Sequence, residues 1–207
     1  MFDPGLIDMI MALRGRGISD NPVLRAMELS PRKNFVDLAY FDVAYAEQAL
    51  PIACGQTLTS PFNIALMTQM LEVSQDHKVL EIGTGSGYHA AILSHLCRRV
   101  YTVERYNALL EGAEAQFKKL GIVNIVSNHG DGRYGWPGQS PFDRILVTCG
   151  LKSPPRRLLK QLSPDGMMIA VINGQLTKLN KNGAIVTQAA LMPMELPIVE
   201  AGKSKIL

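Results

Sequence analysis

The stretch that decides the fold is Lys78-Val79-Leu80-Glu81-Ile82-Gly83-Thr84-Gly85-Ser86-Gly87-Tyr88. It begins with a short apolar strand pattern, Lys78–Ile82, passes through three alternating glycines, and enters a helical pattern at Tyr88. Glycine permits positive φ angles in a tight turn and lets a ligand approach the backbone closely. This order of strand, glycine turn and helix therefore predicts a nucleotide-type binding turn in an α/β protein.

The strand and helix alternation continues beyond this turn. Further strands are predicted at Val100–Val103, Val123–Ser127, Arg144–Thr148 and Met167–Ile172, and helices at Tyr88–Leu96, Asn107–Leu120 and Pro155–Leu162. Short apolar strands between amphipathic helices indicate a mostly parallel sheet with both faces covered. The last forty residues, with a turn at residues 178–183, predict a hairpin at one sheet edge. The expected fold class is α/β: a three-layer, Rossmann-like, doubly wound, mostly parallel sheet with a C-terminal edge hairpin.

The N-terminal third has a different pattern. Residues 4–45 predict short helices, because Asn21-Pro22 and Ser30-Pro31 each place an N-cap residue before a proline. A loop over residues 50–61 leads into a helix predicted at Phe62–Leu71. We find no repeat and no linker. We therefore expect a single domain, 1–207, with a helical N-terminal extension and active-site loop (1–62) and a cofactor-binding α/β core (63–207).

Composition narrows the class of partner. Hydrophobic residues make up 47% and charged residues 19%, values typical of a globular domain. The net charge is only +3 and the basic residues are scattered in pairs, which argues against a nucleic-acid partner. No apolar run approaches a membrane span, no signal peptide is recognised, and neither the cysteines nor the histidines have metal-ligand spacing. We expect a cytoplasmic protein without a metal or membrane partner, and a monomer, although no pattern fixes the oligomeric state.

Two acidic residues lie where neighbouring strands end. Glu104 closes the second predicted strand, about 20 residues after the glycine turn, where a carboxylate can accept both ribose hydroxyls. Asp131 follows the third predicted strand in His129-Gly130-Asp131-Gly132 and belongs to the same rim of the sheet. Together with the turn, these acids predict a ligand that contains a nucleoside.

The residues around the turn favour one kind of nucleoside. A dinucleotide turn needs Gly or Ala where this chain has Tyr88, and a phosphate-binding P-loop needs a Gly-Lys-Ser/Thr that is missing. Glu81, just before the turn, would repel a pyrophosphate but attract the ammonium and sulfonium of S-adenosylmethionine. The sequence therefore predicts S-adenosylmethionine as cofactor, with contacts from Glu81, Gly83, Thr84, Gly85 and Gly87.

Several segments outside the turn are more specific. From about Pro31 to Gly166 the chain contains Pro31-Arg32 with Phe35-Val36, Ala49-Leu50-Pro51-Ile52, Gly55-Gln56-Thr57 with Pro61, Gly130-Asp131-Gly132 with Gly135-Trp136, and Pro141-Phe142-Asp143. In these segments and in the turn, the sequence resembles the protein-L-isoaspartate (D-aspartate) O-methyltransferase family, whose members are class I S-adenosylmethionine-dependent methyltransferases. Many methyltransferases share the glycine turn, whereas the Gly-Gln-Thr segment before it is far more specific to this family.

The resemblance implies a reaction and assigns residues to it. It implies methyl transfer to the α-carboxylate of an isoaspartyl residue in a damaged protein or peptide, followed by spontaneous collapse of the ester to a succinimide. In the family, the loop matching Gln56, Thr57, Leu58 and Thr59 covers the cofactor and meets the substrate. Residues matching Gly83, Glu104, Asp131 and Gly132 hold the cofactor.

This chemistry asks little of catalytic side chains. A terminal-type carboxylate, with a pKa of around 3.5, is already an anion at neutral pH and needs no general base, so positioning dominates. Thr59 and Ser60 lie at the predicted start of a helix, where free N–H groups and the helix dipole favour an anion. We predict that this helix end holds the substrate carboxylate and that the Thr59 hydroxyl orients it. The alternative, that Ser60 is only an N-cap and Thr59 a loop residue, stays open.

Three departures from the family pattern concern the substrate side. Thr59 stands where the family usually has serine, residues 148–155 are longer-sided and basic, and Leu191-Met192-Pro193-Met194 replaces an aromatic residue followed by Val-Pro-Leu. They leave two alternatives open: a diverged carboxyl methyltransferase acting on another peptide or small acid, and a cofactor-binding homologue without repair activity. An RNA methyltransferase is disfavoured, because the Asn/Asp-Pro-Pro-aromatic signature of amine methylation is missing.

Overall fold

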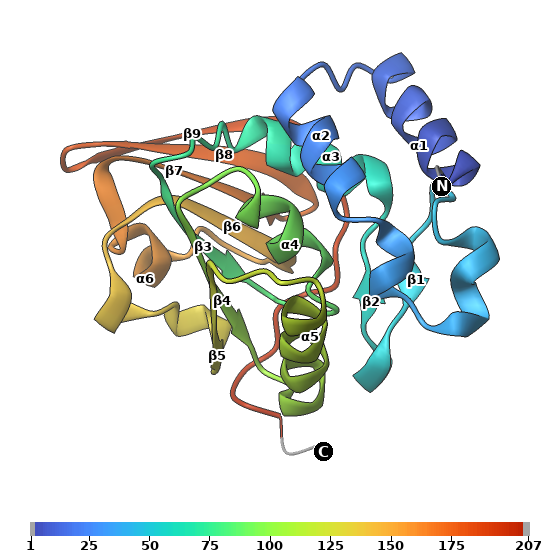
Figure 1. The fold of residues 1–207 in the computed structure, drawn as a ribbon. Coiled ribbons are helices and arrows are strands. Elements are labelled where there is room, and N and C mark those ends of the chain that lie inside the picture. The colour runs from blue at the N-terminus through green and yellow to red at the C-terminus, as the bar shows by residue number, and fades with distance from the viewer. Residues whose placement is uncertain (1–2, 205–207) are drawn as a thin grey trace.

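The computed structural model describes residues 3–204 and is built around one large sheet with the strand order β5-β4-β3-β6-β7-β8-β9 (Figure 1). Five strands run parallel: β3 (Lys78–Ile82), β4 (Arg99–Glu104), β5 (Ile125–His129), β6 (Phe142–Leu151) and β7 (Leu162–Ile172). β8 (Gln175–Asn182) and β9 (Ile185–Pro193) add an antiparallel hairpin at one edge, and β9 is exposed along its length. The predicted α/β fold and edge hairpin are confirmed.

The central strand β3 is buried on both faces. Val79 packs into a cluster with α4 (Tyr88–Ser94) and α5 (Asn107–Lys119), and Leu80 packs into a second cluster with α6 (Arg156–Leu159). Because successive side chains of a strand point to opposite faces, this arrangement gives the three layers expected of a doubly wound sheet. β3 therefore places the glycine turn at the end of a central strand that is largely buried.

The N-terminal region contributes three helices, α1 (Pro4–Gly15), α2 (Asn21–Leu29) and α3 (Pro61–Met70), grouped on one side of the molecule in Figure 1. Their apolar residues, including Leu13, Met27 and Ile64, belong to the same buried cluster as Val79 of the sheet. Between α2 and α3 lie the 3-10 helices η1 (Arg32–Phe35), η2 (Leu38–Val43) and η3 (Ala53–Gly55) and the short antiparallel pair β1 (Leu50–Pro51) and β2 (Thr57–Leu58). Two more 3-10 helices, η4 (Gly132–Tyr134) and η5 (Pro137–Gln139), follow β5.

Some predicted boundaries are wrong. Asn21 is not the N-cap of α2, because Asp20 occupies that position and accepts the Val23 N–H at 3.1 Å. Ser30-Pro31 leads only into the 3-10 helix η1, without a side-chain cap. The helix predicted at Pro155–Leu162 is limited to α6, because Leu162 already pairs with Phe142 as the first residue of β7.

Residues 3–204 contain neither a membrane-spanning helix nor a cluster of metal-ligating side chains. No helix there is both long and apolar enough to cross a membrane. Nor do His, Cys, Asp and Glu side chains in this part of the chain form a group of three that could hold a metal ion.

Candidate active site

The glycine turn after β3 is shaped by its neighbours. Gly83, Gly85 and Gly87 have φ angles of 95°, 54° and 87°, a region that favours glycine. A Cβ on Gly83 would lie 2.4 Å from Thr148 Oγ1 of β6, and one on Gly87 would lie 2.7 Å from the Phe117 ring of α5. Gly83 and Gly87 are therefore required by close packing as well as by backbone conformation.

Glu104, at the end of β4, contacts the glycine turn directly. Its side chain is only 5% exposed, and its Oε2 accepts the Gly85 N–H at 2.9 Å. Its Oε1 accepts the N–H groups of Arg105 and Tyr106 at 2.8 and 3.0 Å. The structure thus brings the turn and the acidic strand end together on one rim of the sheet.

A cavity of about 90 Å³ lies between the turn and a covering segment. The cavity is lined by Thr57, Leu58, Thr59 and Ile64 from the N-terminal region, and by Gly83, Thr84, Gly85, Ser86, Tyr88, His89, Glu104 and Thr148 from the α/β core. The predicted residues Gln56, Ser60, Glu81, Gly87, Asp131 and Gly132 do not line this cavity. Sequence reasoning missed Ile64, Ser86, Tyr88, His89 and Thr148 as lining residues, although Ser86 and Tyr88 lie within the decisive stretch.

The residues present fit S-adenosylmethionine chemically, but the cavity is small. A carboxylate offers about four lone-pair sites, so the three N–H groups on Glu104 leave room for one ribose hydroxyl. The Gly85 N–H can yield its place to the second hydroxyl. Small-molecule sites usually enclose roughly 300–1,000 Å³, so this cavity of about 90 Å³ is large enough for only part of a nucleoside.

Asp131 and Gly132 lie beside Glu104 but serve other contacts. The Gly130 N–H donates to the Glu104 carbonyl at 2.8 Å, which fixes this loop next to the end of β4. The Asp131 carboxylate accepts from the Arg133 guanidinium at 2.7 Å and from the Gly202 N–H at 2.8 Å, and the hydrogen bond from Arg133 lowers its pKa to about 2. Gly132 lines a larger cavity, of about 870 Å³, together with Ile82.

The covering segment is tied to the rim through Gln56. Its Nε2 donates to the Cys54 carbonyl at 3.2 Å and to the Tyr106 hydroxyl at 3.4 Å. Tyr106 follows Glu104 by two residues, so this bond spans from the cover to the acidic strand end. Gln56 therefore positions the cover, although its side chain does not line the cavity.

Thr59 and Ser60, both predicted at the substrate carboxylate, differ in their contacts. Thr59 lines the cavity, whereas Ser60 is the backbone N-cap of α3 and its hydroxyl makes no capping hydrogen bond. The carboxylate of Glu47 accepts the Phe62 N–H of the first helical turn at 3.0 Å. One N–H of this helix end is therefore already bonded to an internal carboxylate.

Glu81 lies beneath the turn in a buried polar chain. It is fully buried, and its Oε2 accepts from the Thr102 hydroxyl at 2.6 Å, which in turn lies 2.6 Å from the Thr84 hydroxyl. Burial raises the pKa of Glu81 from its ordinary value of 4.5 to about 8. The carboxyl is therefore largely protonated at neutral pH, so it supports the turn from below without supplying the negative charge assigned to it from the sequence.

The pKa of Glu81 predicts a pH-dependent stability. Below pH 4.5 both the folded and the unfolded chain hold this proton; as the pH rises towards about 8, only the folded chain keeps it, so stability falls. The Glu81→Gln variant has no such proton to lose, so its unfolding free energy should not fall for this reason. Over the upper half of this pH range, we expect the wild type to lose roughly 1–2 kcal/mol more unfolding free energy than the variant. Urea unfolding at several pH values measures the difference, and parallel pH profiles for the two proteins would contradict it.

Comparison with known proteins identifies relatives along nearly the whole chain. Residues 7–200 match the family model described as Protein-L-isoaspartate(D-aspartate) O-methyltransferase. A protein-L-isoaspartate O-methyltransferase of Maricaulis maris is 44% identical, covering 99% of this chain and 98% of its own length. The same-named protein of Parvibaculum lavamentivorans is 46% identical, covering 94% and 91%.

Solved structures agree in fold. One protein-L-isoaspartate O-methyltransferase superposes with a TM-score of 0.85 at 26% identity, covering 95% of this chain and 66% of its own. A Plasmodium falciparum protein, solved in complex with S-adenosyl-L-homocysteine, has a TM-score of 0.82 at 21% identity and covers 93% and 97%. The second likeness shows the shared fold.

Proposed function

Because this chain belongs to the protein-L-isoaspartate (D-aspartate) O-methyltransferase family, we propose that it repairs damaged proteins by methylating the α-carboxylate of L-isoaspartyl residues. It is an S-adenosylmethionine-dependent methyltransferase. The observation that carries the proposal is the family match over residues 7–200, in a chain whose Glu104 carboxylate holds the glycine turn under a Thr57–Thr59 cover.

The residues on the rim have distinct proposed roles toward the cofactor, which supplies a methyl group on a cationic sulfonium. Glu104 would accept hydrogen bonds from the ribose hydroxyls, and Gly83 and Gly85 would let the nucleoside approach the backbone. The far end of the nucleoside would lie against Asp131, which Arg133 holds as an anion, and against the adjoining Gly132. The cover, Thr57–Thr59, keeps water from the reacting groups.

On the substrate side, the chain positions an anion that needs no deprotonation. Thr59 lines the same cavity as Gly83 and Gly85, which suits its hydroxyl to orient one oxygen of the substrate carboxylate. Ser60 acts through its backbone at the start of α3, where N–H groups and the dipole favour negative charge. The carboxylate and the bound sulfonium would lose their opposite charges as the methyl moves from sulfur to the carboxylate oxygen and the carbon–sulfur bond breaks, so a dry, fixed geometry would favour the reaction.

The Thr59→Val variant tests the hydroxyl, because valine keeps the branched shape and removes the donor. We expect turnover to fall by about tenfold, the cost of losing one hydrogen bond to a charged group, with cofactor affinity unchanged. Thr59→Ser is the matched control and should keep most of the turnover. Wild-type turnover in Thr59→Val would remove the hydroxyl from the mechanism.

The function itself is tested with labelled S-adenosylmethionine and paired peptides that differ only in an aspartyl or isoaspartyl linkage. Methyl ester formation on the isoaspartyl peptide alone is the expected result. Methylation of other peptides or small acids instead would indicate a diverged carboxyl methyltransferase. Cofactor binding without turnover on any acceptor would indicate a homologue that lacks repair activity.

We further propose that the chain works in the cytoplasm as a monomer and a single domain, with 1–62 as helical N-terminal extension and active-site loop and 63–207 as cofactor-binding α/β core. The apolar cluster shared by α1, α2 and the sheet supports one folding unit. Isoaspartyl proteins or peptides are its proposed partners, without nucleic acid or membrane. Light scattering of the purified protein measures the oligomeric state, and a mass twice that of the chain would contradict a monomer.

A further inference from the structure

Arg32 is a buried cation behind the active-site cover. Its side chain is 0% exposed, and its Nη1 donates to the Thr59 carbonyl at 2.7 Å. Its Nη2 donates to the carbonyls of Gln48 and Leu58 at 3.3 and 3.4 Å. The guanidinium also lies 5.4 Å from the centre of the Tyr88 ring. Arg32 thus holds the covering segment by hydrogen bonds from its buried side.

The charge of Arg32 is not neutralised by a direct ion pair. Within residues 3–204, no carboxylate forms a salt bridge with it, and its Nε has no hydrogen-bond partner. Burial lowers its pKa to about 10, so the group stays protonated at neutral pH. An unpaired buried cation is costly for a folded protein, and three carbonyl contacts offset only part of that cost.

The contacts of Arg32 set the direction of two backbone donors. In a trans peptide the C=O and N–H groups point in opposite directions. Because Arg32 takes the carbonyls of Leu58 and Thr59, the N–H groups of Thr59 and Ser60 point away from it. Neither N–H donates to an acceptor in the described part of the chain. Both stand immediately before α3, whose dipole favours an anion.

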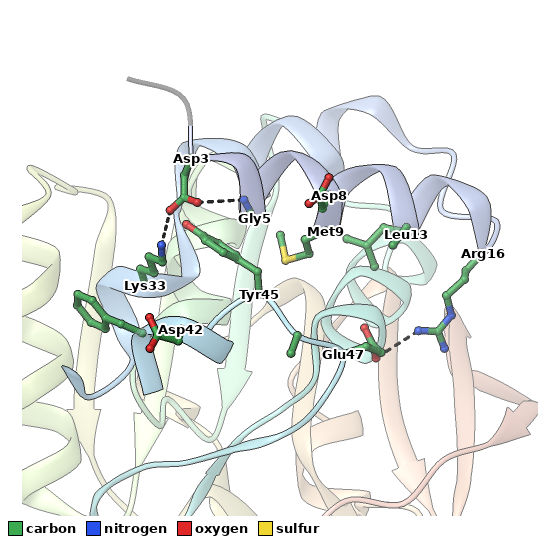
Figure 2. A pocket seen from close by; sticks show the side chains of 13 residues that line it. Asp3, Gly5, Asp8, Met9, Leu13, Arg16, Lys33, Asp42, Tyr45 and Glu47 are labelled. Atoms are coloured by element: carbon green, nitrogen blue, oxygen red, sulfur yellow. Dashed lines mark hydrogen bonds and ion pairs between the residues drawn. The ribbon is translucent and has the colours of Figure 1, made fainter. Parts of the chain in front are cut away.

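The other charges at this helix end offset each other. Glu47 accepts the Phe62 N–H at 3.0 Å and pairs with Arg16 at 3.3 Å, as Figure 2 shows for the Glu47–Arg16 pair. Arg16 also stacks 3.6 Å above the Phe62 ring. Glu47 also attracts the Arg32 guanidinium at longer range and thereby raises its pKa, so Arg16, Glu47 and Arg32 together carry one net positive charge behind the free N–H groups.

We propose that Arg32 is a positioning residue that makes this site select a carboxylate acceptor. It turns the Thr59 and Ser60 N–H groups towards the acceptor and places an unneutralised positive charge behind them. This inference rests on the proposed function, because it names how that same site recognises the anionic form of its substrate.

The test compares binding of two peptides, one with an isoaspartyl residue and one with the same residue as its neutral α-amide, in the presence of S-adenosylhomocysteine. The preference for the anion is the Kd of the α-amide peptide divided by the Kd of the isoaspartyl peptide. We expect Arg32→Gln to lower this ratio by about tenfold or more, because a charge-assisted contact is lost, while the Kd for S-adenosylhomocysteine stays within about threefold. A purely structural role would weaken both peptides equally.

Two further variants complete the test. Arg25→Gln removes an exposed arginine of α2 that pairs with Glu28 at 2.9 Å, and should leave the ratio unchanged. Arg32→Lys keeps the positive charge but lacks the planar guanidinium that bonds to several carbonyls at once. We therefore expect this variant to retain the anion preference and to have a kcat about fivefold lower. An unchanged ratio in Arg32→Gln overturns the inference. If that variant does not fold, an unchanged kcat in Arg32→Lys overturns it.

The same experiment separates this inference from the proposed function. Wild-type protein that neither binds nor methylates the isoaspartyl peptide would refute the proposed function. Wild-type protein that methylates it, together with an Arg32→Gln variant of unchanged anion preference, would refute only the role of Arg32.

Discussion

The Gly83→Ala variant is expected to lose about 3 kcal/mol of unfolding free energy, because the added Cβ atom would cause both backbone strain and a steric clash. The φ angle of 95° is strained for any residue with a Cβ. The added Cβ would also lie 2.4 Å from Thr148 Oγ1, which donates to the carbonyls of Ile82 and Gly83 at 2.9 and 2.8 Å. Urea unfolding measures the loss as a lower midpoint at an unchanged slope.

Gly112→Ala is the matched control for this substitution. Gly112 lies within α5, and a Cβ there would have no heavy atom within 4 Å. Alanine at this position should stabilise the helix by up to about 1 kcal/mol. If Gly83→Ala were as stable as Gly112→Ala, the close approach of β3 and β6 at the turn would not be a constraint.

The Glu104→Gln variant is expected to bind S-adenosylmethionine about 10- to 100-fold more weakly. Hydrogen bonds to a charged acceptor contribute about 1.5–3 kcal/mol each, and the amide keeps only one of the two acceptor oxygens. The same substitution also disturbs the Gly85 contact at 2.9 Å, so the turn loses its fixed position before the ligand arrives. Titration calorimetry gives the Kd directly.

Glu111→Gln serves as the control for Glu104→Gln. Glu111 lies on the exposed side of α5 and accepts from Asn107 at 2.6 Å, so its substitution makes the same change of charge at a residue that does not hold the turn. We expect the Glu111→Gln variant to bind the cofactor as wild type does. Equal affinities for wild type and Glu104→Gln would exclude the carboxylate from ribose binding.

The sheet and the rim could be predicted from the sequence because local pattern and topology agree there. Lys78–Ile82 is predicted to the residue, since a short apolar run ends at a glycine whose φ angle no other residue tolerates well. Parallel strands end on the same rim, so the proximity of Gly85 and Glu104 follows once the strands are placed. By sequence pattern, Leu158 and Leu162 fit either a helix or a strand. Leu162 belongs to a strand because it pairs with Phe142 of β6.

The rest of the site depends on tertiary contacts that leave no local signal. Nothing near Arg32 in the sequence indicates that it reaches the Thr59 carbonyl 27 positions away. Ser60 and Thr59 look equivalent as neighbouring hydroxyls, and only the backbone path into α3 turns Thr59 towards the cavity. The charge expected of Glu81 fails for a similar reason, because burial under Thr84 and Thr102 favours its neutral form.

The exposed strand β9 has a consequence for the protein in concentrated solution. Among the strands described, it borders the sheet on one side, and it carries the exposed apolar side chains Ile185, Val186, Leu191 and Met192. An outer strand with unpaired backbone groups and apolar side chains readily accepts a strand from another molecule. Self-association would therefore begin at this border, which β6, β7 and β8 separate from β3 and its glycine turn.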